Sequence, residues 1–335
     1  MSVLYVEEQG AYIKKRDERI IIEVNKVAIR DVPLVNLEQI VCFGNVQVSS
    51  QTLALLLEQN VELCFLSGHG KFRGRLVGET ARNGRLRQSQ WRVSCDPVLE
   101  RDMAARFVIG KIRNQRALLR RHARQYEGHQ VALKAAADTL TDALRAIPFA
   151  PSLDALRGLE GDAASVYFGV FNLLLRQSGF TFHTRVRRPP RDPVNALLSF
   201  TYTLLANELL AAIQIVGLDP YVGFLHAERH GRASLCFDVI EEFRAPFADS
   251  LVLSVINNRV VNEDDFDTSL EVCTLRDAGK RRFLEQYEQK KQDVLRHPVF
   301  KYQATYKRCF ELQVRLLAKT LIGEIPAYIP FMPRG

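Results

Sequence analysis

The sequence predicts an α+β protein of two domains, a small N-terminal β-sandwich domain followed by a larger all-α domain. Short β-rich runs separated by turn residues fill the first eighty or so of the 335 residues. From Pro97 onward the apolar residues recur with the 3.6-residue period of helices. A polar and basic segment, Arg82–Cys95, separates the two patterns, and a hydrophobic content of 47% is ample for two cores.

The N-terminal β-domain is expected to span residues 1–85. Its predicted strands are Val3–Val6, Ala11–Lys14, Ile20–Val24, Lys26–Val32, Ile40–Phe43 and Val61–Leu66. Gln51–Gln59 has a brief helical pattern, with Ser49 or Ser50 as its N-cap. A hairpin return over Lys71–Glu79 follows the turn Ser67–Gly70, which lacks the spacing of a phosphate-binding loop.

Residues 86–96 are predicted to be a linker, because the segment is polar and Asp96-Pro97 is typical of a helix start. The α-domain then covers residues 97–324. Its predicted helices lie at 97–127, 130–146, 162–178, 193–216, 234–257, 275–292 and 298–321. The last segment, 325–335, is rich in proline and has no apolar period, so we expect an extended C-terminal tail.

Composition narrows the class of protein. The formal net charge is +8 and the pI is near 9.2, which favours an acidic polymer as partner. Six scattered cysteines without a CxxC pair indicate reduced thiols that lie mostly in the core. Met1–Ile20 is charged throughout and has no signal-type apolar block, and no apolar run reaches the length of a membrane span. We therefore expect a cytoplasmic protein with no membrane partner.

A histidine, His226, lies just ahead of a predicted helix that carries acids between apolar residues. Ser234 is expected to be the N-cap, and the residues at helical spacing are Leu235, Val239, Phe243 and Phe247. Asp238, Glu241 and Glu242 are spaced i, i+3 and i+4, so they project in similar directions. Acids beside an apolar seam are costly unless a cation neutralises them. The pattern therefore indicates a divalent-metal site with the imidazole as a nitrogen ligand.

A second interpretation of these residues stays open. His226 could be a core histidine that is hydrogen-bonded to a helix acid, with Glu242 and Arg244 on a solvated face. A metal site also needs ligands from elsewhere in the chain. Glu160 is one candidate, because it lies between Gly158 and Gly161, which permit close backbone approach, just before the helix expected at 162–178. The macrodipole alone favours an acid at a helix start by a few tenths to about 1 kcal/mol.

Two basic segments could follow a phosphate backbone. Prolines hold the loop from Phe182 extended, and its arginines are forked donors that suit phosphate: Arg185, Arg187, Arg188 and Arg191. Asn195 follows as a capping or site-orienting residue. The helix at 101–127 carries eight Lys or Arg, and four share a face: Arg113, Arg116, Arg120 and Arg124. An ordinary solvated face is the alternative for both segments.

Taken together, these segments resemble the CRISPR-associated adaptation integrase family, whose members install new spacers. The residues that carry the resemblance are Gly158–Gly161, Arg187–Pro190 with Asn195–Ser199, Gly217–Pro220 leading to His226, and Ser234–Arg244. The match covers essentially the whole chain and is most similar to the type I-C branch. One departure is His230, a second histidine close to His226.

The resemblance implies that the α-domain is catalytic and that Glu160, His226 and Glu241 ligate Mg²⁺ or Mn²⁺, with Asp238 as a nearby functional acid. It implies a DNA endonuclease and integrase that joins 3′-hydroxyl ends of captured DNA fragments into the repeat array by transesterification. The DNA, double-stranded and branched, would contact the arginines and the asparagine of the basic segments, namely Arg113, Arg116, Arg120, Arg185, Arg187, Arg188, Arg191 and Asn195.

The resemblance also implies partners. Homodimers formed through the β-domain would bind a small CRISPR adaptation partner protein in a hetero-hexameric integration complex. Two other functions remain compatible with the residues. One is a metal-dependent DNA-repair nuclease that acts on branched DNA, and the other is a non-catalytic basic DNA-binding scaffold.

Overall fold

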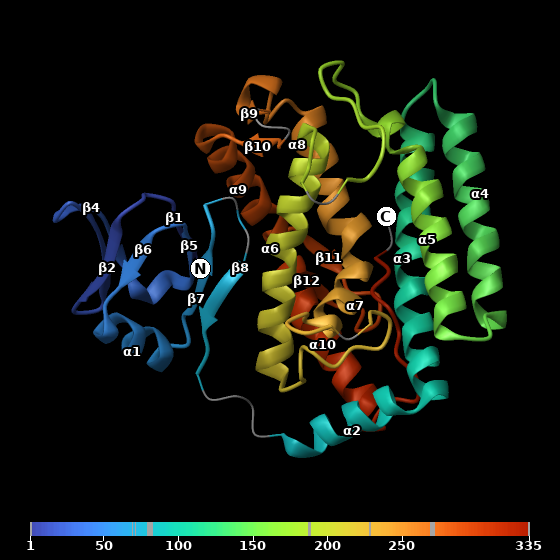
Figure 1. Ribbon diagram of the computed structural model, residues 1–335, viewed down its shortest axis with the longest axis horizontal. Helices are drawn as coiled ribbons and strands as arrows, with labels where there is room; N and C mark the ends of the chain where they lie inside the picture. The colour runs from blue at the N-terminus through green and yellow to red at the C-terminus, as the bar shows by residue number, and fades with distance from the viewer. Residues whose placement is uncertain are drawn as a thin grey trace. The chain divides into compact units, whose positions relative to one another are not determined.

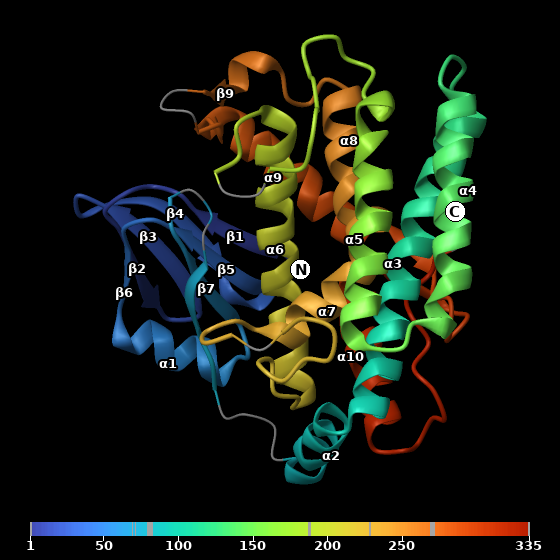
Figure 2. The same ribbon diagram turned by 45° about the vertical axis from the view of Figure 1, so that its right-hand side comes forward.

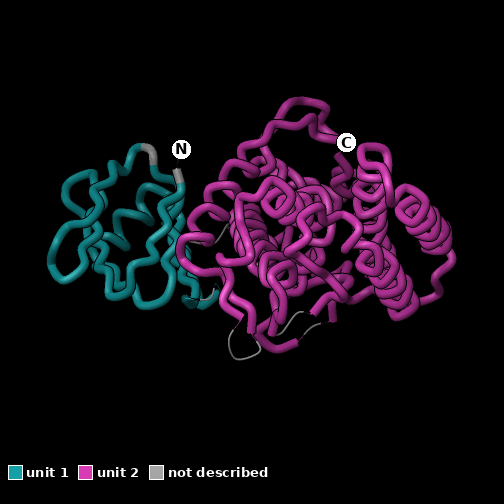
Figure 3. Tube along the Cα trace, turned by 90° about the horizontal axis from the view of Figure 1, so that it is seen from above, with its two compact units in different colours: residues 1–80 teal, residues 81–335 magenta. Residues whose placement is uncertain are grey.

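The alternating apolar runs of the first eighty residues form two four-stranded sheets in a computed structural model. The structure describes residues 2–68, 70, 72–78, 83–186, 189–227, 229–268 and 272–333. The chain divides into two units, residues 1–80 and 81–335 (Figure 3). A β-rich unit followed by a helical unit confirms the predicted fold class. Of the hairpin expected over Ser67–Glu79, His69, Lys71 and Glu79 lie outside the described residues.

The first unit is a sandwich of two mixed sheets. One sheet has the order β1-β5-β7-β8, in which only β8 is antiparallel to its neighbour, and the other has the order β4-β3-β2-β6, in which β6 is parallel to β2. The strands of the first sheet are β1 (Ser2–Val6), β5 (Leu37–Phe43), β7 (Glu62–Leu66) and β8 (Phe72–Leu76). Those of the second are β2 (Ala11–Arg16), β3 (Arg19–Val24), β4 (Val27–Pro33) and β6 (Val46–Val48).

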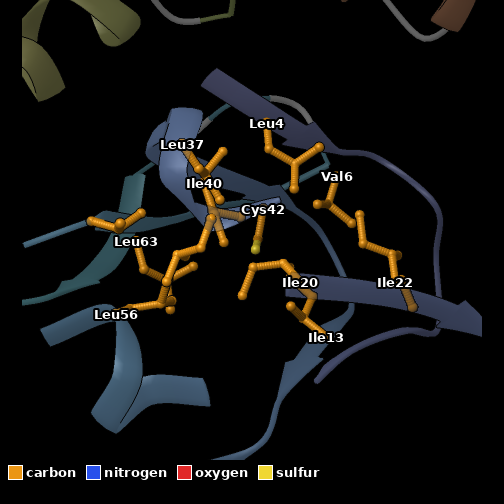
Figure 4. Packing of buried hydrophobic residues seen from close by; sticks show 13 residues of the cluster. Leu4, Val6, Ile13, Ile20, Ile22, Leu37, Ile40, Cys42, Leu56 and Leu63 are labelled. Atoms are coloured by element: carbon orange, nitrogen blue, oxygen red, sulfur yellow. The ribbon is translucent and has the colours of Figure 1, made fainter. Parts of the chain in front are cut away.

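One apolar core fills the space between these sheets. Ile13, Ile20 and Ile22 come from the second sheet, and they meet Leu4, Val6, Ile40, Cys42 and Leu63 of the first (Figure 4). Leu56 of α1 (Ser50–Glu58) joins the same cluster, and the side chain of Ser49 accepts the backbone N–H of Thr52 as the N-cap of α1. Each such aliphatic side chain contributes about 1.5–3 kcal/mol on burial.

The predicted linker at 86–96 is instead a helix, α2 (Gly84–Cys95), that belongs to the helical unit. Gln90 is fully buried, and its amide donates to the carbonyls of Asp219 and Val222 at 2.8 Å each, while its oxygen accepts the N–H of Asp219. The buried face of α2 has one apolar side chain, Leu86, beside the polar Ser89 and Gln90. The apolar period that reveals most helices is therefore missing from this segment.

The rest of the second unit is built from helices. They are α3 (Pro97–Gln125), α4 (Gln130–Ala146), α5 (Leu153–Gly169), α6 (Pro193–Val216), α7 (Ser234–Phe243), α8 (Ser250–Asn257), α9 (Asp277–Gln292) and α10 (Tyr306–Leu321). Helices α3, α4 and α5 stand side by side in both Figure 1 and Figure 2. Two short hairpins, β9 (Phe266–Asp267) with β10 (Thr274–Leu275) and β11 (Val294–Arg296) with β12 (Gln303–Thr305), interrupt the otherwise helical unit.

Several helix boundaries differ from the expected ones. Helix α5 begins at Leu153, capped by Ser152, so Glu160 lies in mid-helix rather than at a helix start. A Cβ added to Gly158 or Gly161 would meet no atom within 4 Å, so these glycines do not mark a crowded backbone. Ser234 is the first residue of α7 rather than its N-cap.

The long helix expected at 234–257 is divided by a wide π-helical segment, Arg244–Asp249, which separates α7 from α8. Pro246 lies within this segment and has no N–H to donate to the helical ladder. Short π-helical insertions are frequent at functional sites.

The expected C-terminal tail packs into the helical unit as far as the structure describes it. Tyr328 and Phe331 are buried, and Gln313 of α10 donates to the hydroxyl of Tyr328 and to the carbonyl of Ile329, each at 2.8 Å. Pro330 lies against Gly110 of α3, where an added Cβ would come within 2.7 Å of the proline Cβ. The segment is extended but integral to the fold.

One helix among the described residues, α6, is long and apolar enough to span a membrane by length and composition. The expectation that no apolar run reaches this length was therefore wrong for this helix. It is weak evidence for a membrane segment, because core helices pass the same test and 61% of its most apolar window is buried inside the structure. It packs against α7 and α10.

Candidate metal centre

Four parts of the helical unit bring charged side chains together. Glu160 comes from α5, Glu241 from α7, and His226 from the loop before α7, and the Nε2 atom of His226 lies 3.8 Å from Oε1 of Glu241. The ammonium group of Lys111, on α3, contacts Oε1 of Glu160 and lies 2.7 Å from Oε2 of Glu241. Lys111 is 4% exposed and Glu241 is 2% exposed, whereas the Glu160 side chain is 25% exposed. The cluster is therefore buried, with its open side at Glu160.

Asp238 orients the imidazole of His226. Its Oδ1 atom accepts from Nδ1 of His226 at 2.8 Å and from the backbone N–H of the same residue at 3.0 Å. Its Oδ2 atom accepts the backbone N–H groups of Phe224 and Leu225. An ionised carboxylate can only accept, so Nδ1 carries a proton, and in the neutral form of the imidazole the lone pair is then on Nε2. Asp238 is thus occupied by four hydrogen bonds in holding the histidine loop.

Gly223 makes this close approach possible. An added Cβ there would come within 2.9 Å of Oδ2 of Asp238 and 2.8 Å of the Cβ of Ser234. The glycine that precedes Phe224 was visible in the sequence beside the histidine. Its spatial role depends on the turn that returns the loop to the first turn of α7.

Glu241 is held in its charged form. Burial alone raises the pKa of this carboxyl, but Arg244, Lys111 and His226 more than offset burial and lower the pKa to about 2. The guanidinium of Arg244 lies 3.0 Å from Oε1 of Glu241 and stacks over the ring of Tyr202, 4.4 Å from its centroid. Glu241 is therefore a buried carboxylate with a full negative charge at neutral pH.

A second acidic group, Asp249, is close enough to Arg244 to raise the pKa of its guanidinium. Asp249, at the end of the π-helical segment, accepts the hydroxyl protons of Tyr202 at 2.5 Å and Tyr167 at 2.9 Å. Burial raises the pKa of Asp249, while the two tyrosine hydrogen bonds and Arg244 oppose the rise. The π-helical segment thus begins with Arg244, the cation beside Glu241, and ends with Asp249, a buried acid.

Glu242 points away from this cluster, although its spacing predicted a direction similar to that of Glu241. Its Oε1 atom is 2.7 Å from the hydroxyl of Tyr328, and Oε2 accepts the backbone N–H of Phe331 at 2.6 Å. Burial raises the pKa of this carboxyl to about 8. Glu242 anchors the C-terminal segment and is not a candidate ligand.

The donor set suits a divalent ion, although no group of three His, Cys, Asp or Glu side chains within the described part of the chain is close enough to hold one as it stands. The ammonium of Lys111 lies between the carboxylates of Glu160 and Glu241 and contacts both. Two carboxylates therefore already converge on one positive charge, and the free Nε2 of His226 borders Glu241. Carboxylate oxygens with one imidazole suit Mg²⁺ and, more strongly, Mn²⁺.

Lys111 and Arg244 were not identified from sequence as parts of this site. Lys111 was counted only as one of the basic residues of its helix. A signal was nevertheless present, because Met103, Phe107 and Lys111 are spaced i, i+4 and i+8 on the buried face of α3. A lysine in an apolar stripe predicts a buried acidic partner, since an unpaired buried ammonium is costly.

The predicted arginine stripe of α3 runs beside α4. Arg116 donates to Thr141 at 3.1 Å, and Arg120 contacts Asp138 at 3.3 Å and remains largely exposed. Arg113 is also exposed. Arg116 is the most enclosed of the three, and burial together with Arg120 and Arg113 lowers its pKa.

The proline-rich loop is fastened from inside. Asn195 is fully buried; its amide donates to the carbonyl of Thr184 and to Asp192, and its oxygen accepts from Val186 and Arg185. The expectation that Asn195 contacts DNA therefore does not fit, because its polar atoms are used within the loop. Arg185 binds Asn195 and Ser199, and Arg191 is exposed, whereas Arg187 and Arg188 lie outside the described residues.

A cavity of about 370 Å³ lies beside the loop that carries His226. Its lining includes Trp91 and Tyr221, which are 47% and 56% exposed, and the basic residues Arg229, His230 and Arg232. Exposed aromatic rings next to arginines are suited to stacking and charge contacts with unpaired nucleotides.

The chain is similar to known proteins over its whole length. The family model described as CRISPR associated protein Cas1 matches residues 4–289. The CRISPR-associated endonuclease Cas1 3 of Thermus thermophilus is 40% identical over 338 residues, which cover 100% of this chain and 98% of that protein. A Cas4 exonuclease/Cas1 endonuclease fusion of Geobacter sulfurreducens is 40% identical over 99% of this chain, which spans only 60% of the fusion.

Solved structures share the fold. A Cas1 protein from Thermotoga maritima superposes with a TM-score of 0.82 at 27% identity, covering 96% of this chain and 97% of that one. A casposase bound to integration product has a TM-score of 0.84 at 22% identity, covering 98% and 93% of the two chains. A chain of a Cas6-RT-Cas1–Cas2 complex has a TM-score of 0.81 at 22% identity, covering 100% of this chain and 36% of that one. At 22% identity the likeness concerns the fold alone.

Proposed function

The chain belongs to the Cas1 family of CRISPR-associated endonucleases, and from that premise we propose that it is a divalent-metal-dependent DNA endonuclease and integrase of spacer acquisition. Glu160, Glu241 and His226 would hold the ion. The observation that carries this proposal is the convergence of two carboxylates from different helices on one positive charge, next to an imidazole with a free nitrogen.

The proposed reaction is a transesterification. A 3′-hydroxyl of a captured DNA fragment attacks a phosphodiester of the repeat array, and another 3′-hydroxyl leaves, so that one P–O bond forms as another breaks. The attacking and leaving groups are alike, and the exchange therefore needs alignment and charge stabilisation rather than a large driving force. Mg²⁺ or Mn²⁺ would stabilise negative charge on the phosphoryl oxygens.

The side chains around the ligands have supporting roles in this proposal. Asp238 would keep the imidazole of His226 in the tautomer whose Nε2 atom can bind a metal. Arg244 would keep Glu241 ionised and would itself be fixed by its stacking on Tyr202. The same site with water as the attacking group would hydrolyse DNA, which accounts for both an endonuclease and an integrase activity.

The DNA would follow the exposed arginines of the helical unit. We assign phosphate contacts to Arg113, Arg120 and Arg191, which are exposed, and a loop-holding role to Arg185 and Asn195. An unpaired nucleotide near the reacting end would enter the cavity between Trp91 and Tyr221, where the rings can stack on bases.

The partners proposed for the chain follow its family. A structural relative is described as part of a Cas6-RT-Cas1–Cas2 complex. By analogy, homodimers formed through the β-sandwich would bind a dimer of a small adaptation protein in a hetero-hexamer, which holds double-stranded and branched DNA.

A strand-transfer assay on half-site DNA with Mn²⁺ tests this function. Glu160→Gln, Glu241→Gln and His226→Ala should each lower joining by at least about 100-fold, since each removes an ion ligand. Asp154→Asn is the matched control, because Asp154 is an exposed acid on the same helix as Glu160 and should leave joining unchanged. Wild-type activity in all three variants would contradict the proposal. Hydrolysis without joined strands would identify a nuclease only, and DNA binding without either product a scaffold.

A further inference from the structure

We propose that Lys111 is an internal counter-ion that occupies the space between Glu160 and Glu241 and competes with the divalent ion for these two carboxylates. The inference rests on the proposed function, because it concerns the same metal site. It assigns a positioning role to a residue that the family resemblance did not single out.

The cluster around Lys111 is buried. The carboxyl of Glu241 is almost fully enclosed, and Glu160 faces it from a different helix. Two neighbouring carboxylates repel each other strongly when both are ionised, unless a cation lies between them. The Lys111 ammonium supplies that cation and is itself buried, so the three groups stabilise one another at the junction of α3, α5 and α7.

Two different cations contact the carboxylate of Glu241. Arg244 contacts Oε1 and Lys111 contacts Oε2 of this carboxylate. Arg244 can therefore keep Glu241 ionised after the ammonium of Lys111 has moved. The ammonium of Lys111 also contacts the carboxylate of Glu160. Lys111 is thus the group whose displacement frees one oxygen of each acid.

The ammonium of Lys111 and a divalent ion cannot occupy the space between the two carboxylates together. A divalent ion that bound these two oxygens would lie against the ammonium group, and like charges in a buried site repel strongly. The lysine must therefore withdraw, and its four-carbon stem allows this without movement of α3. Loading the site exchanges one cation for another, which lowers the apparent affinity for the metal.

The chain offers a matched control. Lys291, on α9, is also a buried lysine between two carboxylates, with Oε1 of Glu208 at 2.6 Å and Oε1 of Glu288 at 2.9 Å. Replacing either lysine by methionine removes a buried cation from an acid pair. Only Lys111 belongs to the cluster that also contains His226.

The test measures metal affinity and thermal stability rather than activity. The full chain is stripped with EDTA and titrated with Mn²⁺ in a calorimeter, with wild type, Lys111→Met and Lys291→Met compared. We expect the Kd for Mn²⁺ to fall about tenfold in Lys111→Met and to stay at the wild-type value in Lys291→Met. Without metal, both variants should melt roughly 5 °C or more below wild type, and Mn²⁺ should restore stability only to Lys111→Met.

An equal or higher Kd in Lys111→Met would overturn the inference. If Glu160→Gln also abolished Mn²⁺ binding, the proposed metal site would stand without the competing lysine. If no variant and no wild-type protein bound Mn²⁺, both the site and the inference would be wrong. Should Lys111→Met fail to fold, a crystal of wild type soaked in Mn²⁺ decides. The ammonium must then have left at least one carboxylate, and an ion bound with Lys111 still against both would overturn the inference.

Discussion

The β-sandwich and the helical unit bury different kinds of side chain. Between its two sheets the sandwich buries an aliphatic cluster, and its buried polar side chains among the described residues are the uncharged Gln39 and Thr52. The helical unit buries ionisable groups, and these include Lys111, Asp238, Glu241, Glu242, Asp249, Lys280 and Lys291. One chain therefore contains a core of ordinary hydrophobic type and a core that is rich in ionisable groups.

Buried ionisable groups, rather than buried apolar area, indicate which unit carries the function. Aliphatic burial stabilises at about 25 cal/mol per Å² and needs no partner, so the sandwich core is explained by folding alone. Buried charges cost free energy unless each is paired, and a fold gains little from them that apolar residues could not supply. A cluster of such groups with strongly shifted pKa values is therefore a candidate for chemistry.

The largest effect is expected from Asp238→Ala, which breaks the polar core directly. The change leaves the backbone N–H groups of Phe224, Leu225 and His226 and the imidazole without their acceptor. We expect a loss of about 3–5 kcal/mol in the free energy of unfolding and a fall of about 10–100-fold in Mn²⁺ affinity. Trp91 is the single tryptophan of the chain and lies on α2, so its fluorescence in denaturant reports on the helical unit.

The control for this variant is Asp142→Ala, an exposed acid of α4 that should change stability by less than about 0.5 kcal/mol. Unchanged Mn²⁺ affinity in Asp238→Ala would show that the imidazole needs no orienting carboxylate. The buried acid would then have a role in stability only.

A smaller effect is expected from Leu63→Ala in the sandwich. Removing this buried side chain leaves a cavity between the sheets and should cost about 2–5 kcal/mol. Because Leu63 belongs to an apolar cluster, the Mn²⁺ affinity should equal that of wild type. Hydrogen exchange in β1, β5 and β7 measures the loss, and Val35→Ala, at a highly exposed position, is the control. A change in Mn²⁺ affinity would show that the two cores are energetically coupled.

The change that is smallest per pH unit is the pH dependence of stability contributed by Glu242. Its pKa in the folded chain, about 8, is above its usual value of 4.5, so the folded state binds the proton more tightly than the unfolded state. Stability should therefore fall as pH rises from about 4.5 to 8, with a slope of at most about 1.4 kcal/mol per pH unit.

Glu242→Gln keeps the shape of the side chain and removes its titration. We expect the variant to lose this slope and to be more stable than wild type at pH 9, where Glu242 is charged. Urea unfolding followed by Trp91 fluorescence at pH 5, 7 and 9 measures the difference. Parallel curves for the two proteins across this range would place the pKa of Glu242 near its ordinary value.

Local signals predicted most of the fold. Helix α6 was expected at 193–216 and has these bounds, because Asp192 caps its first turn at 2.8 Å and Gly217 ends it with a φ of +95°. Strand β2 begins with the alternation that a half-buried strand requires, because Ala11 and Ile13 are buried and Tyr12 between them is exposed. Helix α2 and the start of α5 were misplaced, since Gln90 is buried through hydrogen bonds and Ser152 lies before glycines that interrupt the apolar period.

The candidate ligands Glu160, His226 and Glu241 were proposed from the sequence, and the structure brings them near one another. The role of Lys111 could not be proposed in the same way. Its partners lie 49 and 130 positions further along the chain, and only the packing of α3 against α5 and α7 makes them neighbours. Likewise, helical spacing placed Glu241 and Glu242 in similar directions, but Glu242 accepts hydrogen bonds from Tyr328 and Phe331 instead.

The amino-acid order by itself determined the two-domain α+β division, most helix and strand positions, and a short set of acids and one histidine suited to a metal. These features follow from interactions between residues close in the chain, whose periods and caps are readable in one dimension. The tertiary structure alone decided which acid faces which cation, because pairing in a buried site depends on distance in space. It also decided that a lysine stands between the two carboxylates.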